Sequence, residues 1–316
     1  MTPTSTTYIG RFAPSPTGAL HAGSLIAALA SYVDARAQGG QWRLRIDDLD
    51  APRVVPGARG EILRTLEAHG LYWDGPVVEQ SARKQRYAEA LAKLDKAGDL
   101  YACTCSRREI ARVAATGPLG RVYPGTCRKR SAAPGGDAAL RLALPSQALQ
   151  LSDDTCGPIA LRADIDVGDV VVRRRDGLPA YHVATTVDDA DLGITHVVRG
   201  ADLLPAAVVQ TVVQRRLGLP ASAWRHLPLA RTPDGDKLSK QTGAQPLDAT
   251  RPIPALLAAW SRLGQMPPPE TPTSAADFLE WAIAHWRTEC IPAESAPAAV
   301  PQSALHTPAL PASTRP

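Results

Sequence analysis

The segment that most constrains the fold lies near the start of the chain and predicts a βαβ unit. Residues 8 to 12 (Tyr-Ile-Gly-Arg-Phe) are typical of a short strand. A helix is expected from 23 to 37, because apolar residues recur on one face: Leu25, Ile26, Leu29, Ala30 and Val33. Gly39 and Gly40 end that helix, and residues 42 to 46 alternate as a second strand. A right-handed crossover then places the Pro- and Gly-rich turn around His21 at the carboxyl edge of a parallel sheet, where α/β proteins form ligand sites.

This turn is a candidate phosphate site. Backbone N–H groups and the positive end of the helix meet just after His21, and Gly23 would let a nucleotide approach the backbone closely. A second segment, Lys237-Leu-Ser-Lys240-Gln241, supplies two cations in a loop with glycines on either side. Each segment also has a plainer interpretation. His21 could be a capping or core histidine, and the two lysines could be solvated loop charges.

Length and composition indicate a folded enzyme in the cytoplasm. With 316 residues, of which 44% are hydrophobic and 21% charged, the chain can bury a core and build two folded units. The first residues lack the basic and apolar regions of a secretion signal, and no apolar run is long enough to cross a bilayer. We therefore expect a cytoplasmic protein with no membrane partner. The net charge of +4 permits a localised basic face without demanding one.

The character of the sequence changes after Leu100. Helices are expected at about 57 to 69 and 82 to 97, but residues 101 to 180 are rich in Cys, Arg and Gly and then in short strands and turns. The clearest hairpin signal in that stretch runs from 170 to 179. We predict an α/β domain over 1–100 and 181–245, with a helix at about 205 to 217, and an insertion over 101–180. A short helical region over 246–290 and a disordered Ala- and Pro-rich tail over 291–316 complete the prediction.

Three of the five cysteines are close together in the insertion. Cys103, Cys105 and Cys127 supply three thiols in a chain without a secretion signal, so a disulfide framework is not expected. A tetrahedral metal site needs a fourth ligand. On spacing alone, reduced thiols and a metal site both remain open.

Several motifs in order now support a family resemblance. The strings Arg11-Phe-Ala-Pro-Ser-Pro-Thr-Gly, His21-Ala-Gly23, Ile46-Asp-Asp-Leu-Asp50, Val198-Arg199-Gly-Ala-Asp202 and Lys237-Leu-Ser-Lys-Gln241 resemble those of the glutamyl-tRNA synthetase group of class I aminoacyl-tRNA synthetases. The resemblance runs from about residue 8 to 265. The run Gly23-Ser-Leu-Ile-Ala-Ala-Leu, the residue Gln241 and the short sequence after it favour a shortened paralogue, which would lack the large helical domain that reads an anticodon. A truncated ordinary synthetase and a non-catalytic zinc- and tRNA-binding module are the alternatives.

The resemblance implies a Rossmann-like class I catalytic domain with a zinc-bearing α+β insertion. It also implies a ligase that activates L-glutamate with ATP and Mg²⁺ as glutamyl-adenylate, without tRNA. The shortened paralogues then transfer glutamate to queuosine in the anticodon of tRNA(Asp). We expect a monomer.

The resemblance also assigns site residues. His21 and Lys240 would be catalytic, and His21, Gly23, Ser24, Lys237 and Lys240 would bind ATP. The glutamate pocket would consist of Arg11, Phe12, Ala13, Pro14, Ser15, Asp47, Tyr181 and Arg199. A guanidinium pairs with a carboxylate bidentately, which suits Arg11 and Arg199 to the γ-carboxylate. Asp47 stands where the family normally has Glu, so it would reach the ammonium of glutamate over a longer gap or through water. The plainer interpretation of Arg199 is an ion pair with Asp202.

The insertion carries the remaining assignments. By resemblance, Cys103, Cys105, Tyr123 and Cys127 would hold one structural Zn²⁺ per chain. Basic residues of the insertion would contact phosphates of the tRNA or form a solvated face: Arg107, Arg108, Arg112, Arg121, Arg128, Lys129 and Arg130.

Overall fold

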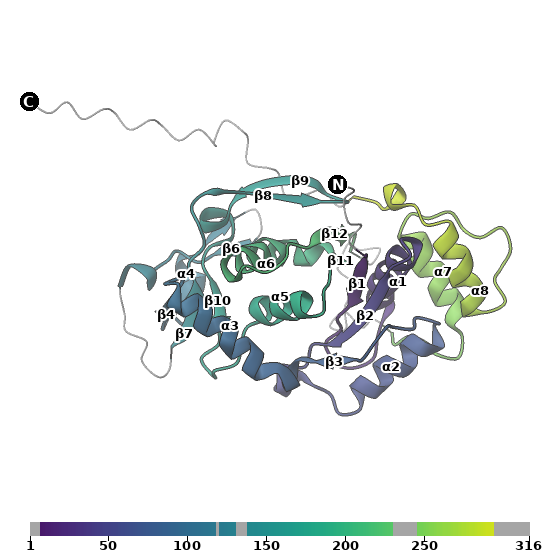
Figure 1. Cartoon of the computed structure of the whole chain (residues 1–316), viewed down its shortest axis with the longest axis horizontal. Helices are drawn as coiled ribbons and strands as arrows, with labels where there is room; N and C mark the ends of the chain where they lie inside the picture. Colours follow the sequence, from purple (N-terminus) through teal and green to yellow (C-terminus); the bar gives the residue numbers. More distant parts are fainter. Residues whose placement is uncertain (1–6, 118–119, 131–137, 230–244, 294–316) are drawn as a thin grey trace, which may run out of the picture.

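A computed structural model of the chain describes residues 7–117, 120–130, 138–229 and 245–293. Its centre is a parallel sheet (Figure 1). β1 (Ile9–Phe12), β2 (Gln41–Ile46) and β3 (Val78–Glu79) are parallel neighbours, as are β11 (His196–Gly200) and β12 (Ala223–Leu227). The two groups meet where the backbone N–H of Thr195 donates to the carbonyl of Ile9 at 2.9 Å. The strand order is therefore β3-β2-β1-β11-β12, with the topological switch point between β1 and β11.

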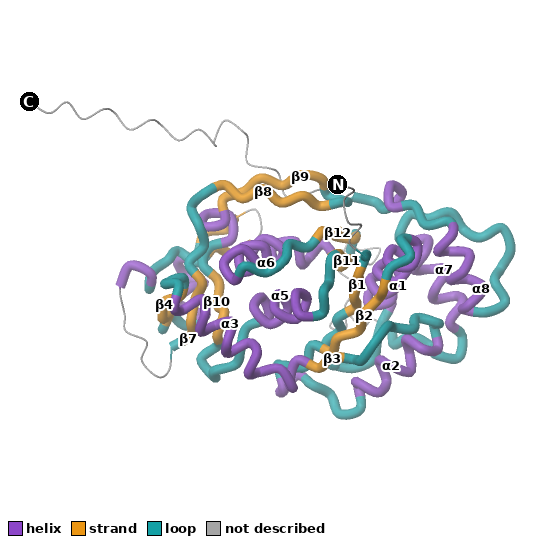
Figure 2. Tube along the Cα trace, in the orientation of Figure 1, coloured by secondary structure: helices purple, strands orange, loops and turns teal. Residues whose placement is uncertain are grey.

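Helices cover both faces of this sheet (Figures 1 and 2). One side carries α1 (Ala22–Ala37), α2 (Ala58–Ala68), α7 (Pro252–Arg262) and α8 (Ala275–Ala284). The other carries α3 (Lys84–Lys96), α5 (Tyr181–Asp191) and α6 (Leu204–Leu217). The helices predicted at 23–37, 57–69, 82–97 and 205–217 are confirmed, as are the strands on either side of the first. Among the described helices, none is both long and apolar enough to cross a bilayer.

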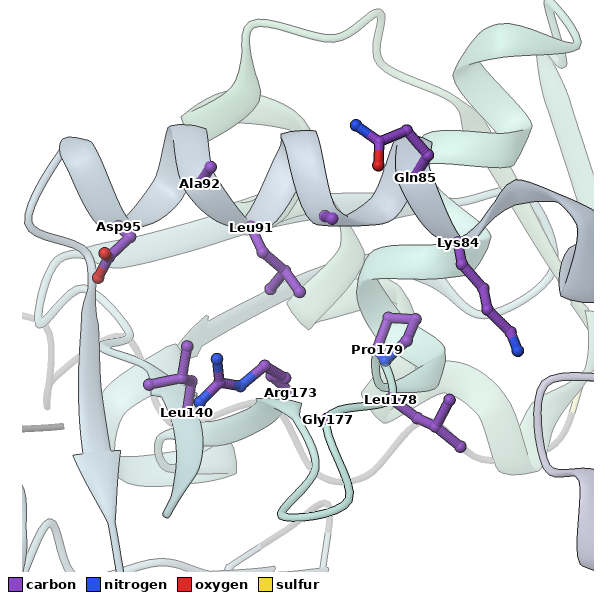
Figure 3. Close-up of a pocket in the computed structure, with 11 residues that line it drawn as sticks. Lys84, Gln85, Leu91, Ala92, Asp95, Leu140, Arg173, Gly177, Leu178 and Pro179 are labelled. Carbon is purple, nitrogen blue, oxygen red and sulfur yellow. The ribbon is translucent and has the colours of Figure 1, made fainter. Parts of the chain in front are cut away.

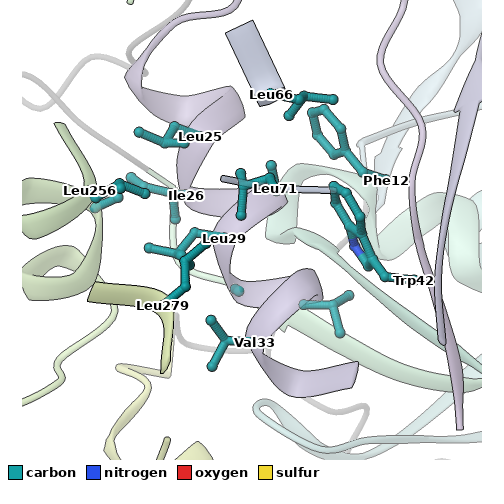
Figure 4. Close-up of a cluster of buried hydrophobic side chains, with 14 of the residues drawn as sticks. Phe12, Leu25, Ile26, Leu29, Val33, Trp42, Leu66, Leu71, Leu256 and Leu279 are labelled. Atoms are coloured by element: carbon teal, nitrogen blue, oxygen red, sulfur yellow. The ribbon is translucent and has the colours of Figure 1, made fainter. Parts of the chain in front are cut away.

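Each face of the sheet has its own apolar core. In the first core, Leu25, Ile26, Leu29 and Val33 of α1 pack against Trp42 of β2 and against Leu256 and Leu279 of the C-terminal helices (Figure 4). The second core joins α3, α5 and α6 to the strands of the insertion. Because α1 is buried on both its sheet side and its α7–α8 side, its N-terminus is held firmly at the carboxyl edge of the sheet.

The predicted insertion, residues 101–180, contributes strands to different sheets. Its antiparallel sheet consists of β4 (Leu100–Cys103), β7 (Ala139–Leu142) and β10 (Val170–Arg173), beside α4 (Arg107–Val113) and the ribbon of β5 (Ala115–Gly117) and β6 (Gly120–Val122). β8 (Ala148–Asp153) and β9 (Gly157–Arg162) instead extend the main sheet, since Asp153 pairs with Trp224 of β12. Their apolar residues are buried in the second core, which makes the main sheet their natural partner. The hairpin predicted at 170–179 is confirmed, with Arg174 N–H donating to Leu178 O at 2.8 Å.

Candidate active site

The predicted site residues converge at the carboxyl ends of the parallel strands. Arg11 lies in β1, Asp47 follows β2, Arg199 lies in β11, and Tyr181 opens α5. These elements meet at the switch point of the sheet, the position at which open α/β sheets bind their ligands.

His21 caps α1 and also lines a cavity. Its Nδ1 accepts from the backbone N–H of Ser24 at 3.4 Å, so the capping interpretation is correct. The cavity beside it, about 170 Å³ in volume, is lined by His21, Gly23 and Ser24 and, across the sheet, by Gly200 and Asp202. Capping leaves His21 as part of the cavity wall, and the first turn of α1 faces this space with its positive end.

Lys237, Lys240 and Gln241 lie outside the described residues. The described segments on either side of them both reach the His21 cavity. Leu229 lines it, and Pro246 forms an antiparallel bridge with His21 while Leu247 N–H donates to Leu20 O at 3.0 Å.

Arg11 is held by a buried network of charges. Arg45, which has no solvent exposure, contacts Asp189 through Nη1 at 2.6 Å and Asp47 through Nε at 2.6 Å. Arg11 Nε lies 3.4 Å from the same Asp189 oxygen, and its Nη1 donates to Val198 O at 3.3 Å. Burial disfavours the ionised form of Asp189, but the charges of Arg11 and Arg45 outweigh it and hold the pKa of this carboxyl below its ordinary value. Asp189 therefore stays ionised and fixes Arg11.

Asp47 is already engaged within the protein. Its carboxylate pairs with Arg45, and burial raises its pKa although Arg45 opposes the rise. Its backbone N–H donates to Pro14 O at 3.0 Å, which joins the segment 11–15 to the end of β2. The role of Asp47 toward an ammonium group remains a prediction, because its short side chain lies against Arg45.

The other members of the predicted pocket are placed differently from one another. Tyr181 is 37% exposed at the start of α5, so its ring is accessible. Phe12 is buried in the first core, with its ring centroid 6.3 Å from that of Trp42, so its side chain points away from the site. Any contribution of Phe12 to substrate binding must come from its backbone. Ala13 is half-buried and Ser15 is exposed.

Arg199 is a buried cation with neutral partners. It is 4% exposed, and its guanidinium donates to His226 Nε2 at 3.2 Å, Gln210 Oε1 at 2.8 Å and Leu203 O at 3.0 Å. Among the described residues, no carboxylate forms an ion pair with it, so the alternative pairing with Asp202 is not seen. Three of its five N–H groups are used, and burial lowers its pKa from the ordinary arginine value.

The contacts of His226 define its tautomer. Because Arg199 Nε carries a proton that it donates, His226 Nε2 must accept, and the ring proton must sit on Nδ1. That nitrogen lies 2.5 Å from Asp153 Oδ2, to which it donates. Burial lowers the pKa of His226, which agrees with a neutral ring. The chain Asp153–His226–Arg199 therefore orients the guanidinium.

The predicted metal ligands converge in one place, here called the cysteine cluster: Cys103, Cys105, Tyr123 and Cys127. The three sulfur atoms lie within 4.8 Å of one another, and the Tyr123 hydroxyl lies 3.5 Å from two of them. These donors suit a tetrahedral Zn²⁺, since three thiols and an oxygen surround one point. Burial works against the thiolate of Cys127, but hydrogen bonding from Tyr123 and its neighbours lowers its pKa to about 6.

Sequence reasoning missed the residues that support the site. Arg45 was counted as part of an alternating strand, and His226 was not singled out. Asp189 follows Tyr181 in the sequence but has no predicted role. The strand pattern carries no signal for Arg45, because it occupies a polar position of an alternating strand, as the half-buried Arg43 does, and that pattern does not reveal that its charge is buried.

Comparison with known proteins agrees with this geometry. A family model of the catalytic domain of class I tRNA synthetases (E and Q) matches residues 9–251. The glutamyl-Q tRNA(Asp) synthetase of Ectopseudomonas mendocina is 49% identical over 289 residues, which cover 91% of this chain and 96% of that relative. The enzyme of the same name from Dechloromonas aromatica is 50% identical over 291 residues, covering 91% of this chain and 97% of that relative.

Solved structures place the fold in the same group. The glutamate–tRNA synthetase of Elizabethkingia anophelis superposes with a TM-score of 0.73 at 26% sequence identity, over 92% of this chain and 68% of that one. The glutamate–tRNA ligase of Elizabethkingia meningosepticum, solved in complex with its amino acid, gives a TM-score of 0.71 at 25% identity, over 92% of this chain and 67% of that one. The chain belongs to the class I tRNA synthetases of the E and Q family, in the branch of the glutamyl-Q tRNA(Asp) synthetases.

Proposed function

We propose that the protein is an ATP-dependent ligase that activates L-glutamate and transfers it to queuosine at the wobble position of tRNA(Asp). In the first step a glutamate carboxylate oxygen attacks the α-phosphorus of ATP, and pyrophosphate leaves. In the second step a hydroxyl of the queuosine cyclopentenediol attacks the glutamyl carbonyl, and AMP leaves as the ester forms. The names of the relatives, with about half of their residues identical, support this choice of acceptor.

The observation that carries the proposal is that Arg199 has no ion-pair partner in the part of the chain that the structure describes. A buried cation is costly without an anion, and the three acceptors around Arg199 are all neutral. The γ-carboxylate of glutamate would supply the missing charge and bind bidentately, whereas the amide of glutamine would not. Asp189 and Arg45 hold Arg11 beside it as a second cation.

ATP would bind at the His21 cavity. The first turn of α1 offers N–H groups and a positive end to the phosphates, and Mg²⁺ would accompany them. Lys237 and Lys240 would join them, because the described residues on both sides of their segment meet His21. Lys240→Ala should lower the rate of ATP–pyrophosphate exchange by about two to three orders of magnitude, since it would remove a charge that stabilises the transition state. Near-normal exchange by that variant would reject the assignment.

One Zn²⁺ would be held by Cys103, Cys105, Tyr123 and Cys127. Its role would be structural, because the module of α4, β5 and β6 around it has few other buried residues. We also propose that the protein acts as a monomer in the cytoplasm.

Charging with labelled glutamate tests the proposed function. Queuosine-containing tRNA(Asp), unmodified tRNA(Asp) and tRNA(Glu) would be compared, alongside ATP–pyrophosphate exchange without tRNA. We expect exchange without tRNA and transfer to the queuosine-containing tRNA alone. Efficient charging of tRNA(Glu) would point to an ordinary synthetase, and absence of exchange would point to a non-catalytic protein.

A further inference from the structure

Two cavities meet beside the cysteine cluster. The outer cavity, about 460 Å³ in volume, is lined on its polar side by Arg107, Arg174 and Arg175. The inner cavity, about 390 Å³, is so named because it includes Tyr181 of the predicted glutamate pocket, and it is lined by Arg121, Tyr181 and His182. Arg141, Ile110 and Val171 line both cavities, so the two are neighbours separated by these side chains.

The walls of both cavities carry an excess of positive charge. Their acidic members are Asp169 and Asp176, fewer than the arginines. Asp169 is already engaged, because Tyr101 OH donates to it at 2.7 Å and Leu144 N–H at 2.8 Å. Asp176 pairs with Arg174 at 2.8 Å. Arg107, Arg121 and Arg175 are exposed, and none of them forms an ion pair among the described residues. Arg175 Nη2 donates to the carbonyl of Thr104, and its other N–H groups, like the guanidinium groups of Arg107 and Arg121, are available to an anion.

The inner cavity adjoins the glutamate pocket. Tyr181 and His182 form the first turn of α5, the helix whose Asp189 holds Arg11. Burial, followed by the charge of Arg199, lowers the pKa of His182 to about 4, so the ring is neutral and lies within the field of Arg199. His182 Nδ1 has no hydrogen-bond partner in the described part of the chain. His182 therefore borders the cavity as a neutral side chain with an unused hydrogen-bonding nitrogen.

We propose that these cavities bind the RNA acceptor strand, with backbone phosphates in the outer cavity and one nucleoside in the inner cavity. The inference rests on the proposed function and adds where the acceptor binds. Proteins recognise single-stranded loops by turning bases out and stacking them on aromatic side chains or guanidinium planes. The inner cavity has the volume of a small-ligand pocket and offers Tyr181 for stacking and His182 for a hydroxyl. Arg121, at its wall, would contact the adjoining phosphate.

A third cavity provides a matched control. It has a volume of about 540 Å³ and opens between α3 and the hairpin that follows β10, with Leu91 and Pro179 pointing into it and Lys84 and Asp95 toward its ends (Figure 3). It shares that hairpin with the outer cavity, but no residue of the glutamate pocket lines it. Lys84→Ala therefore removes a cation close to the outer cavity without changing a residue that lines the outer or the inner cavity.

The experiment measures binding and single-turnover transfer to an anticodon stem-loop that carries queuosine. Arg121→Ala and Arg175→Ala should each weaken binding about tenfold, roughly the loss of one charge-assisted hydrogen bond. Each should also reduce the slope of log affinity against log salt by about 0.7, the value for one phosphate contact on a single strand. Transfer should fall more than ATP–pyrophosphate exchange does, and Lys84→Ala should change neither binding nor salt slope.

His182→Gln separates the inner cavity from the outer one. It should slow transfer about tenfold, as expected for one lost hydrogen bond in the cavity, and leave the salt slope unchanged, because no phosphate contact is removed. If the rates of transfer and of ATP–pyrophosphate exchange fell equally, His182 would act in the glutamate pocket, and its proposed role in the inner cavity would be wrong. If the arginine variants behaved like Lys84→Ala while the unmodified enzyme transferred normally, this inference would be wrong and the proposed function would stand. Normal exchange with no transfer by the unmodified enzyme would instead reject the proposed acceptor.

Discussion

Arg199 shows how residues behind the proposed site hold one of its side chains in place. The guanidinium donates to neutral acceptors, one of which is His226. The hydrogen bond from His226 Nδ1 to Asp153 fixes the tautomer of that ring. Asp153 Oδ1 is itself held by the backbone N–H groups of Thr155 at 3.0 Å and Cys156 at 2.9 Å. The orientation of the arginine therefore depends on a residue that does not touch the substrate.

Asp153→Asn should raise the KM for glutamate. The amide oxygen would remain on the backbone N–H groups, so the NH₂ group would face His226 Nδ1 and force the ring proton onto Nε2, against Arg199. Loss of a hydrogen bond to a charged group corresponds to about tenfold or more. Exchange kinetics should show this rise with the KM for ATP changed by less than about threefold. The control is Asp154→Asn, whose side chain is 44% exposed and pairs with Arg225. A parallel rise in both KM values would contradict the positioning role.

Residues proposed to contact substrate were easier to predict than the residues that hold them in place. Arg11, Tyr181 and Arg199 belong to recognisable motifs, and the structure brings them to one edge of the sheet. Asp153 and His226 meet only because β8 joins the main sheet beside β12, a pairing that local sequence does not encode. Phe12 belongs to the same motif as Arg11 yet faces the core, since successive side chains of a strand point to opposite sides.

Elements were predictable where their apolar period was clear. α1 and α6 were expected at nearly their observed bounds, because both helices have apolar residues at helical spacing. The sheet that β8 and β9 join was not predictable. Their apolar and polar residues would alternate in the same way whether they paired within the insertion or with the main sheet. The cysteine cluster is an intermediate case: the spacing of the cysteines left reduced thiols and a metal site open, and the structure brings the three thiols together.

At the element scale, Cys105→Ser should loosen the module of α4, β5 and β6 before it affects adenylation. This module has a small buried cluster of its own, so the metal would contribute much of its stability. Amide exchange over residues 103–117 and 120–130 should accelerate, and metal analysis should fall from one zinc per chain. Relative to the parent protein, the rate of ATP–pyrophosphate exchange should fall by a smaller fraction than the zinc content does. Cys156→Ser, outside the cysteine cluster, is the control, and a purified parent protein without stoichiometric metal would reject the zinc site.

At the scale of the molecule, the active site lies on the seam between two apolar cores. β2 belongs to the first core and α5 to the second, and Arg45 reaches from one to Asp188 and Asp189 of the other. Asp188 also accepts from Gln80 at 2.8 Å and from Tyr87 OH at 2.9 Å. The network that holds Arg11 is thus the same network that joins the first core to the second.

Arg45→Ala should therefore destabilise the whole protein, by about 3–5 kcal/mol at neutral pH, because it leaves the buried carboxylate of Asp47 without its partner and removes one of the two cations beside Asp189. The sign of the pH dependence follows from Asp47. In the parent its pKa is raised by burial, against the charge of Arg45. In the variant the charge of Arg45 is absent, so burial raises the pKa of Asp47 further and makes its ionised form costly at pH 7. Protonation of Asp47 relieves this cost as pH falls, while Asp189 keeps Arg11 as its partner. Urea unfolding should show that the difference in free energy of unfolding between parent and variant narrows from pH 7 to pH 5. The control is Arg59→Ala, which breaks an ion pair whose arginine is 48% exposed. It should cost less than about 1 kcal/mol at both pH values. A gap that stays constant with pH would mean that Arg45 acts through packing rather than charge.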